Sequence, residues 1–152
     1  YPSLNDEIDI VLSGKRNKSR ISYVTDSTSV VDLIDRADHV YVSRQIASYI
    51  VHLTTATRNH PDIKVGSSPR GSIALQNLAK AYALYHGRNY VEPEDVRYLA
   101  PYTLSHRLIL NHAAKTAKRE PASVVQDVLK SVSVPVADEY LQETAHEWRR
   151  HD

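Results

Sequence analysis

The chain has 152 residues and a formal charge of +1, with 19 basic and 18 acidic side chains and no cysteine. The near balance of charge gives no global attraction to nucleic acid or acidic membranes, and the lack of cysteine excludes disulfide frameworks and thiolate metal sites. No apolar run approaches the ~20 residues of a membrane helix, and no signal peptide opens the sequence. We therefore expect a soluble, cytoplasmic protein without a membrane partner. The start at Tyr1 and the absence of methionine indicate a fragment of a longer polypeptide.

Helical patterns fill the first part of the chain. Ser3 and Asp6 are spaced as a helix cap, and apolar residues then recur at helical intervals up to Gly14. These apolar residues are Leu4, Ile8, Val11 and Leu12. The basic run 15–20 has no aromatic residue and no period. We interpret it as a solvated loop, with contact to nucleic acid or a partner as the alternative.

The next segment is predicted to hold two helices. A serine and threonine start at 27–29 precedes a short apolar helix, and 40–42 is a small extended piece. Ser43 is expected to cap a helix whose apolar residues share one face as far as Arg58, and Pro61 ends that helix.

The turn 66–72 is the most unusual helix start in the sequence. Ser68 is a good N-cap, with Ser67 as the alternative cap, and Pro69 suits the first helical position. Arg70 then lies in the first turn, where the helix dipole disfavours a cation by about 0.3–1 kcal/mol. Gly71 weakens the same turn by about 0.5–1 kcal/mol relative to alanine.

Two interpretations of this turn remain open. Free backbone amides, the positive helix end and the guanidinium of Arg70 converge on one place, which suits a phosphate. Alternatively, Arg70 is a solvated or ion-paired surface residue, and Gly71 relieves crowding between helices.

The second half of the chain is also predicted to be helical. The longest stripe follows the turn and stops at His86 and Gly87; its members are Ala74, Leu75, Leu78, Ala81, Tyr82 and Tyr85. A helix begins near Pro93, another covers 101–110, and 111–120 is a polar connection. Pro121 opens a helix that carries Val124, Val125, Val128, Leu129 and Val132, and a last helix starts near 137. The predicted fold class is therefore all-α, a helical bundle with short irregular connections.

A complete active site is not recognisable in the sequence. The glycines at 66 and 71 have P-loop spacing, but Ser72 stands where the lysine belongs and no apolar strand is expected before the turn. The segment 136–139 only mimics a magnesium-binding strand end, and 146–151 misses the zinc-protease motif by one residue. The histidines at 52, 60, 106 and 112 lack ligand spacing, so we expect no metal site.

A set of motifs resembles the C-terminal lid domain of MoxR-family AAA+ ATPases over about residues 1–136. Ser67, where the family usually has a small apolar residue, and the basic stretch after Gly14 depart from the pattern. The matching motifs are Tyr-Ile-Val at 49–51, Ala-Thr-Arg at 56–58, His-Pro at 60–61, Val-Gly-Ser-Ser-Pro-Arg-Gly-Ser at 65–72, Ala-Lys-Ala at 79–81, Gly-Arg-Asn-Tyr-Val-Glu-Pro-Glu-Asp-Val at 87–96 and Leu-Ser-His-Arg at 104–107.

The resemblance implies a helical lid, residues 1–136, that follows an α/β nucleotide-binding core missing from this chain. Residues 137–152, predicted from their pattern as an additional C-terminal helix, extend past the family's usual lid. In such enzymes the arginine of this turn is the sensor-2 residue, here Arg70, which contacts ATP phosphates beside the Ser68 cap. ATP and Mg²⁺ would be held in the full-length parent. Without its Walker A and Walker B motifs, the fragment alone is expected to be inactive.

Further expectations concern partners. The family resemblance implies the missing core, neighbouring subunits of a ring oligomer and proteins with von Willebrand A-type domains, in chaperone-like remodelling. Arg58, Arg107 and the region of Tyr82 and Tyr85 are candidates for subunit contacts, with ordinary packing as the alternative for each. A different class of function, a helical adaptor or nucleic-acid-binding bundle, would use the basic run 15–20; the charge balance makes nucleic acid the less favoured partner.

Overall fold

The computed structural model describes residues 1–13 and 22–136. The basic run 15–20, the helix expected from 137 and the motif-like segment 146–151 lie outside the described residues. The chain divides into two compact units, 1–32 and 33–152. Among the described helices, none is both long and apolar enough to cross a membrane.

The first unit contains α1 (Leu4–Ser13) and the start of α2 (Ser27–Asp38). Ser3 caps α1 as predicted: its hydroxyl accepts from the Asp6 amide at 3.3 Å, and Asp6 in turn accepts from the Ser3 amide at 3.2 Å. The Ser3 hydroxyl also donates to the Asp6 carboxylate at 2.6 Å, and this bond, together with the one from the Ser3 amide, lowers the pKa of Asp6. The start at 27–29 is also confirmed, although the cap is Asp26, which accepts from the Ser29 amide at 2.7 Å. The apolar residues of both helices are exposed.

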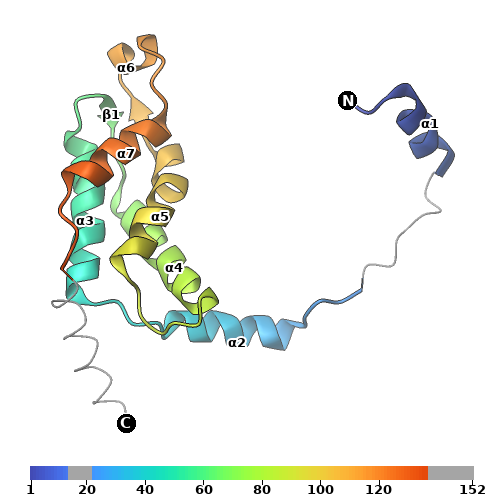
Figure 1. The fold of residues 1–152 in the computed structure, drawn as a ribbon, viewed down its shortest axis with the longest axis horizontal. Helices are drawn as coiled ribbons and strands as arrows, with labels where there is room; N and C mark the ends of the chain where they lie inside the picture. The colour runs from blue at the N-terminus through green and yellow to red at the C-terminus, as the bar shows by residue number, and fades with distance from the viewer. Residues whose placement is uncertain (14–21, 137–152) are drawn as a thin grey trace. The chain divides into compact units, whose positions relative to one another are not determined.

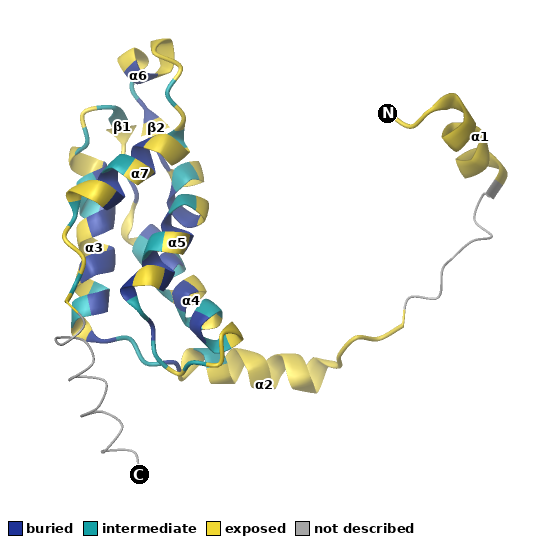
Figure 2. Ribbon diagram, in the orientation of Figure 1, coloured by how far each residue is buried: buried dark blue, intermediate teal, exposed yellow. Residues whose placement is uncertain are grey.

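Four helices form the core of the second unit (Figures 1 and 2). They are α3 (Arg44–Asn59), α4 (Pro69–Tyr85), α5 (Pro93–Leu104) and α7 (Pro121–Ser131). Helix α4 packs against α3 and α5, and α7 packs against α3 and α5. Their shared interior is apolar, with Ile46, Leu53, Leu75, Val96, Leu104 and Val125 fully buried. The predicted Ser43 cap is present, since its hydroxyl accepts from the Ile46 amide at 3.2 Å.

The predicted helix over 101–110 is wrong. Helix α5 runs through Pro101 to Leu104, a 3₁₀ turn η2 (Ser105–Arg107) follows, and the chain then becomes strand β2 (Ile109–Leu110). Proline is tolerated inside α5 because Ala100, Thr103 and Leu104 are buried around it, which outweighs one lost backbone hydrogen bond. Strand β2 pairs antiparallel with β1 (Ile63–Val65), so the extended segments before the turn 66–72, called here the arginine turn, and after α5 satisfy each other's backbone groups.

Two further details differ from the sequence prediction. The connection 111–120 contains a short helix, α6 (His112–Thr116), capped by Asn111, which accepts from the Ala114 amide at 2.9 Å. On α4 the buried residues are Gly71, Leu75, Ala79 and Ala83, spaced four apart. Three members of the predicted stripe, Leu78, Ala81 and Tyr85, are exposed instead. The small residues on this face let α4 approach its neighbours closely. The buried face of α4 therefore covers fewer residues than the apolar stripe predicted from the sequence.

The end of α4 and the start of α5 are fastened together. Gly87 has a φ of +73°, the left-handed conformation that ends a helix, as predicted for this stop. The next residue, Arg88, donates two hydrogen bonds to the buried carboxylate of Asp95, at 2.8 and 2.6 Å. Asp95 also accepts from the Glu92 amide at 2.9 Å and so completes a capping box at the start of α5.

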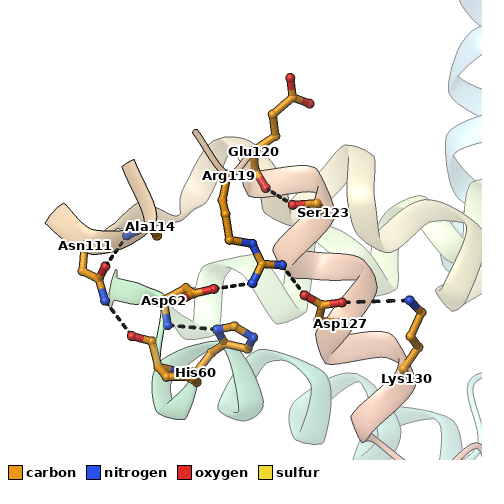
Figure 3. A network of polar contacts seen from close by, with 10 residues as sticks. His60, Asp62, Asn111, Ala114, Arg119, Glu120, Ser123, Asp127 and Lys130 are labelled. Atoms are coloured by element: carbon orange, nitrogen blue, oxygen red, sulfur yellow. Dashed lines mark hydrogen bonds and ion pairs between the residues drawn. The ribbon is translucent and has the colours of Figure 1, made fainter. Parts of the chain in front are cut away.

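A second polar network joins β1, the loop after α6, and α7 (Figure 3). Arg119 donates to Asp62 and to Asp127, and Asn111 donates to the carbonyl oxygen of Pro61 at 2.6 Å. The hydrogen bond from Arg119 lowers the pKa of Asp127. This network fixes the β1 end of the bundle, from which the chain enters the arginine turn.

Candidate functional site

The turn 66–72 connects β1 to α4, and its helix start is only partly as predicted. Pro69 occupies the first turn, and Ser68 has the extended conformation of an N-cap, with φ −78° and ψ 169°. However, the Ser68 hydroxyl makes no capping hydrogen bond, and the Ser67 hydroxyl points to the Ser68 carbonyl at 3.4 Å instead. The prediction of a side-chain cap is therefore wrong; in the first turn of α4 the Gly71 amide donates instead to the carbonyl oxygen of Ser68 at 2.8 Å.

Helix α3 holds this turn through side-chain contacts. The Ser67 amide donates to the hydroxyl of Thr57 at 2.9 Å, and the Ser67 carbonyl accepts from Nε of Arg58 at 2.7 Å. One turn earlier on α3, the Thr54 hydroxyl lies 2.9 Å from the Ser72 hydroxyl. Ser67, Thr54 and Thr57 are buried. Sequence analysis missed these contacts, because nothing in the spacing of serines and threonines says which helix faces them.

Both glycines of the turn are sites of close packing. A Cβ on Gly66 would lie 2.6 Å from Cα of Arg58, and a Cβ on Gly71 would lie 2.0 Å from Oγ of Ser67 and 3.5 Å from Cδ2 of Leu104. Gly71 is buried. Its small size is therefore explained by packing inside the bundle rather than by the approach of a ligand.

Arg70 differs from the ion-paired arginines of the chain. It is exposed, and it has no hydrogen bond or ion pair with any residue in 1–13 or 22–136. The first turn of α4 contains no acidic residue. By contrast, Arg88 and Arg119 are each paired with carboxylates. The predicted place of Arg70, a cation in the first turn of α4, is confirmed, and its contact with a phosphate stays a prediction.

The other residues singled out in the sequence are placed as follows. Arg58 contacts the turn, and Nε of Arg107 donates to the Thr103 carbonyl of its own segment at 3.1 Å. Tyr82 and Tyr85 lie at the C-terminal end of α4, where Tyr82 is 5.2 Å from the ring of Tyr98. That ring is 5.7 Å from Tyr102. Sequence analysis missed this surface row of tyrosines, which the i, i+4 spacing of Tyr98 and Tyr102 on α5 could have indicated.

The near misses also have a structural outcome. Strand β1 directly precedes Gly66, where no apolar strand was expected; it contains Lys64, and none of its three residues is fully buried. It belongs to a two-stranded antiparallel ribbon, and Ser72 still replaces the P-loop lysine, so the turn does not become a P-loop. Within the described residues, no three histidine or acidic side chains are grouped closely enough to hold a metal ion.

Comparison with known proteins identifies the domain. Residues 55–130 match the family model of the AAA lid domain. The chain thus belongs to the AAA lid domain family.

Related proteins extend the similarity beyond that segment. The chain is 30% identical to the chaperone MoxR1 of Mycobacterium tuberculosis over 89% of its length, and 38% identical to the uncharacterized protein YeaC of Bacillus subtilis over 90%. A crystal structure of a candidate ATPase from Cytophaga hutchinsonii superposes with a TM-score of 0.74 at 26% identity, covering 90% of this chain. The predicted fold class and the resemblance to MoxR-family lids are confirmed.

The chain spans less than half the length of these relatives. It covers 43% of YeaC, 38% of MoxR1 and 44% of the Cytophaga chain. The activity of a whole protein of this kind is therefore a matter for proposal.

Proposed function

We propose that this domain closes over ATP bound to a core domain outside the chain, and that Arg70 contacts the phosphates of that ATP. The observation that carries the proposal is the state of Arg70: an exposed guanidinium in the first turn of α4, with no partner among the described residues. A cation at this position opposes the helix dipole. An anion bound between the helix start and the guanidinium reverses that cost, since both then attract it.

The chain's own groups fit one part of an ATP site. Arg70 supplies a fork of donors that matches phosphate oxygens, and α3 holds the turn that presents it. Bound ATP would supply the reactive γ-phosphoryl group. The described residues contain no cluster of metal ligands, and in our proposal the core contributes the protein ligands of Mg²⁺, the P-loop lysine and the residue that positions water.

The consequence of phosphate contact is lid closure. A contact between Arg70 and the phosphates that forms only when ATP is bound shifts the angle between the lid and the core, and hydrolysis of ATP breaks that contact. In our proposal this movement drives chaperone-like remodelling in a ring of subunits, with von Willebrand A-type domain proteins among the partners. The name of the related chaperone MoxR1 supports the remodelling role.

The test is steady-state ATP hydrolysis by the full-length protein. Arg70→Ala is expected to lower kcat/KM by tenfold or more, because a single arginine acting on a phosphoryl transition state contributes up to about 10³–10⁵ in rate. Lys115→Ala on α6 removes an exposed cation elsewhere and serves as the control. Wild-type hydrolysis by the Arg70 variant would refute the proposal.

A further inference from the structure

The residue that fixes the arginine turn is Ser67, and consecutive α3 side chains bind both of its backbone polar groups. Thr57 accepts from its amide at 2.9 Å, and Arg58 donates to its carbonyl at 2.7 Å. Ser67 is 1% exposed and Thr57 is fully buried. The bond to Thr57 is buried, and a hydrogen bond in such a water-poor place is strong and holds its geometry. Arg58 is exposed, and its charge-assisted bond to the Ser67 carbonyl is partly buried. The backbone of Ser67 therefore has little freedom to move relative to α3.

The backbone on either side of Ser67 is equally constrained. Gly66 lies so close to Arg58 that an added Cβ would be 2.6 Å from its Cα and 2.7 Å from its amide nitrogen. On the other side, Ser68 is extended, as expected before a proline, and Pro69 fixes its own φ near −65°. Only these two restricted residues separate Ser67 from Arg70. Because α3 holds Ser67 in place, the position of the Arg70 Cα is fixed relative to α3 as well.

We propose that Thr57 and Arg58 are positioning residues for Arg70: they make α3 and the arginine turn one rigid unit. The proposal rests on the function given above, because it assigns the clamp the task of placing a phosphate-contacting group. Arg58 acts through a charge-assisted hydrogen bond to a carbonyl, a role distinct from the subunit contact considered for it in the sequence. Contact of Arg70 with a nucleotide then moves α3 together with the turn.

A double-mutant cycle on ATP hydrolysis by the full-length protein tests the inference. Arg58→Ala is expected to lower kcat/KM about fivefold in the wild-type background and to have no further effect in the Arg70→Ala background. A clamp that acts through Arg70 cannot matter once that side chain is gone. Equal losses in both backgrounds would overturn the inference while leaving the function of Arg70 intact.

The threonine provides a matched pair of variants. Thr57→Val removes the hydroxyl acceptor at nearly constant shape and is expected to lower kcat/KM, whereas Thr57→Ser keeps an acceptor and is expected to restore most of the activity. Thr116→Val is the control, since among the described residues that hydroxyl bonds only to the carbonyl oxygen of His112 within α6. Equal activity of the valine and serine variants would overturn the role of Thr57.

Hydrogen exchange in the same full-length variants separates the two proposals. The peptide covering 66–72 is expected to exchange faster in Arg58→Ala and Thr57→Val and at the wild-type rate in Thr57→Ser. Unchanged exchange in the first two variants would overturn the clamp. Faster exchange together with wild-type hydrolysis by Arg70→Ala would instead refute the proposed function, and with it the clamp's role in positioning a phosphate contact.

Discussion

Replacing Gly66 by alanine tests whether α3 and the arginine turn are in direct backbone contact. The added Cβ would lie 2.6, 2.7 and 2.8 Å from Cα, N and Cγ of Arg58. Carbon atoms prefer separations of about 3.5–4.0 Å, so the turn must retreat by about 1 Å. Two of the three atoms belong to the backbone of α3 and cannot rotate away.

The size of the effect follows from three contributions. Overpacking costs about 1–3 kcal/mol, and loss of one hydrogen bond between Ser67 and α3 adds about 0.5–1.5 kcal/mol. Alanine also reduces the conformational freedom of the unfolded chain, which offsets the destabilisation by about 0.4–1 kcal/mol. We expect a net destabilisation of about 2 kcal/mol, and a fall in Tm of about 4–8 °C for a chain of this size.

Thermal unfolding followed by far-UV circular dichroism measures this change. Ser68→Ala is the control in the neighbouring residue: its hydroxyl makes no capping bond, so we expect a change within about 0.5 kcal/mol. A Gly66→Ala chain that unfolds at the wild-type temperature would show that the turn is not packed against α3 as described.

Three other outcomes follow from the fold. Tyr49→Phe removes a buried hydroxyl that makes no hydrogen bond of good geometry among the described residues, although Arg97 lies near enough to interact with it. Stability measured by urea unfolding should therefore stay within about 1 kcal/mol of wild type or increase; a larger loss would show that the contact with Arg97 stabilises the fold. Arg88→Ala leaves the carboxylate of Asp95, 3% exposed, without its bidentate partner, and should cost about 3 kcal/mol in the same assay. The pKa of Asp127 is lowered by Arg119. The contribution of Asp127 to stability is therefore present above the unfolded pKa of about 3.9 and is lost as the pH falls through the lower folded value. Asp127→Asn should flatten the loss of stability below about pH 4, and an unchanged acid profile would contradict this.

Helix boundaries were predictable because their signals are local. The caps at Ser3 and Ser43, the proline starts at 69, 93 and 121, and the glycine stop at 87 all lie where the sequence indicates. Each depends on the chemistry of a few consecutive residues, which tertiary contacts have little reason to override.

Features that depend on contacts between distant segments were not predictable. The short ribbon pairs Ile63 with Leu110, 47 residues apart by subtraction, and its strands are too brief to show a period of two. The buried face of α4 was misjudged because alanines at 79 and 83, rather than the larger Leu78 and Tyr85, face the core. The distance at which α4 packs against its neighbours determines which of these residues are buried, and that distance cannot be read from the sequence.

The sequence indicated Arg70 but not the residues that hold its turn, and the contact of Arg70 with a phosphate stays a prediction. Arg70 was singled out because a cation opposes the dipole of its own helix, a conflict visible in the sequence. The role of Gly71 was left open; it is buried, and a Cβ at this position would lie 2.0 Å from Oγ of Ser67, which supports the packing interpretation. Thr57 and Arg58 were invisible as a pair, since their partner lies nine or ten residues away in a turn of unknown orientation.

The most direct test of the account is a structure of the full-length protein bound to a non-hydrolysable ATP analogue and Mg²⁺. We expect a guanidinium nitrogen of Arg70 about 2.7–2.9 Å from a phosphate oxygen, with Ser67 still bound to Thr57 and Arg58. A closed lid in which Arg70 points into solvent, or pairs with a carboxylate while another residue contacts the phosphates, would contradict it.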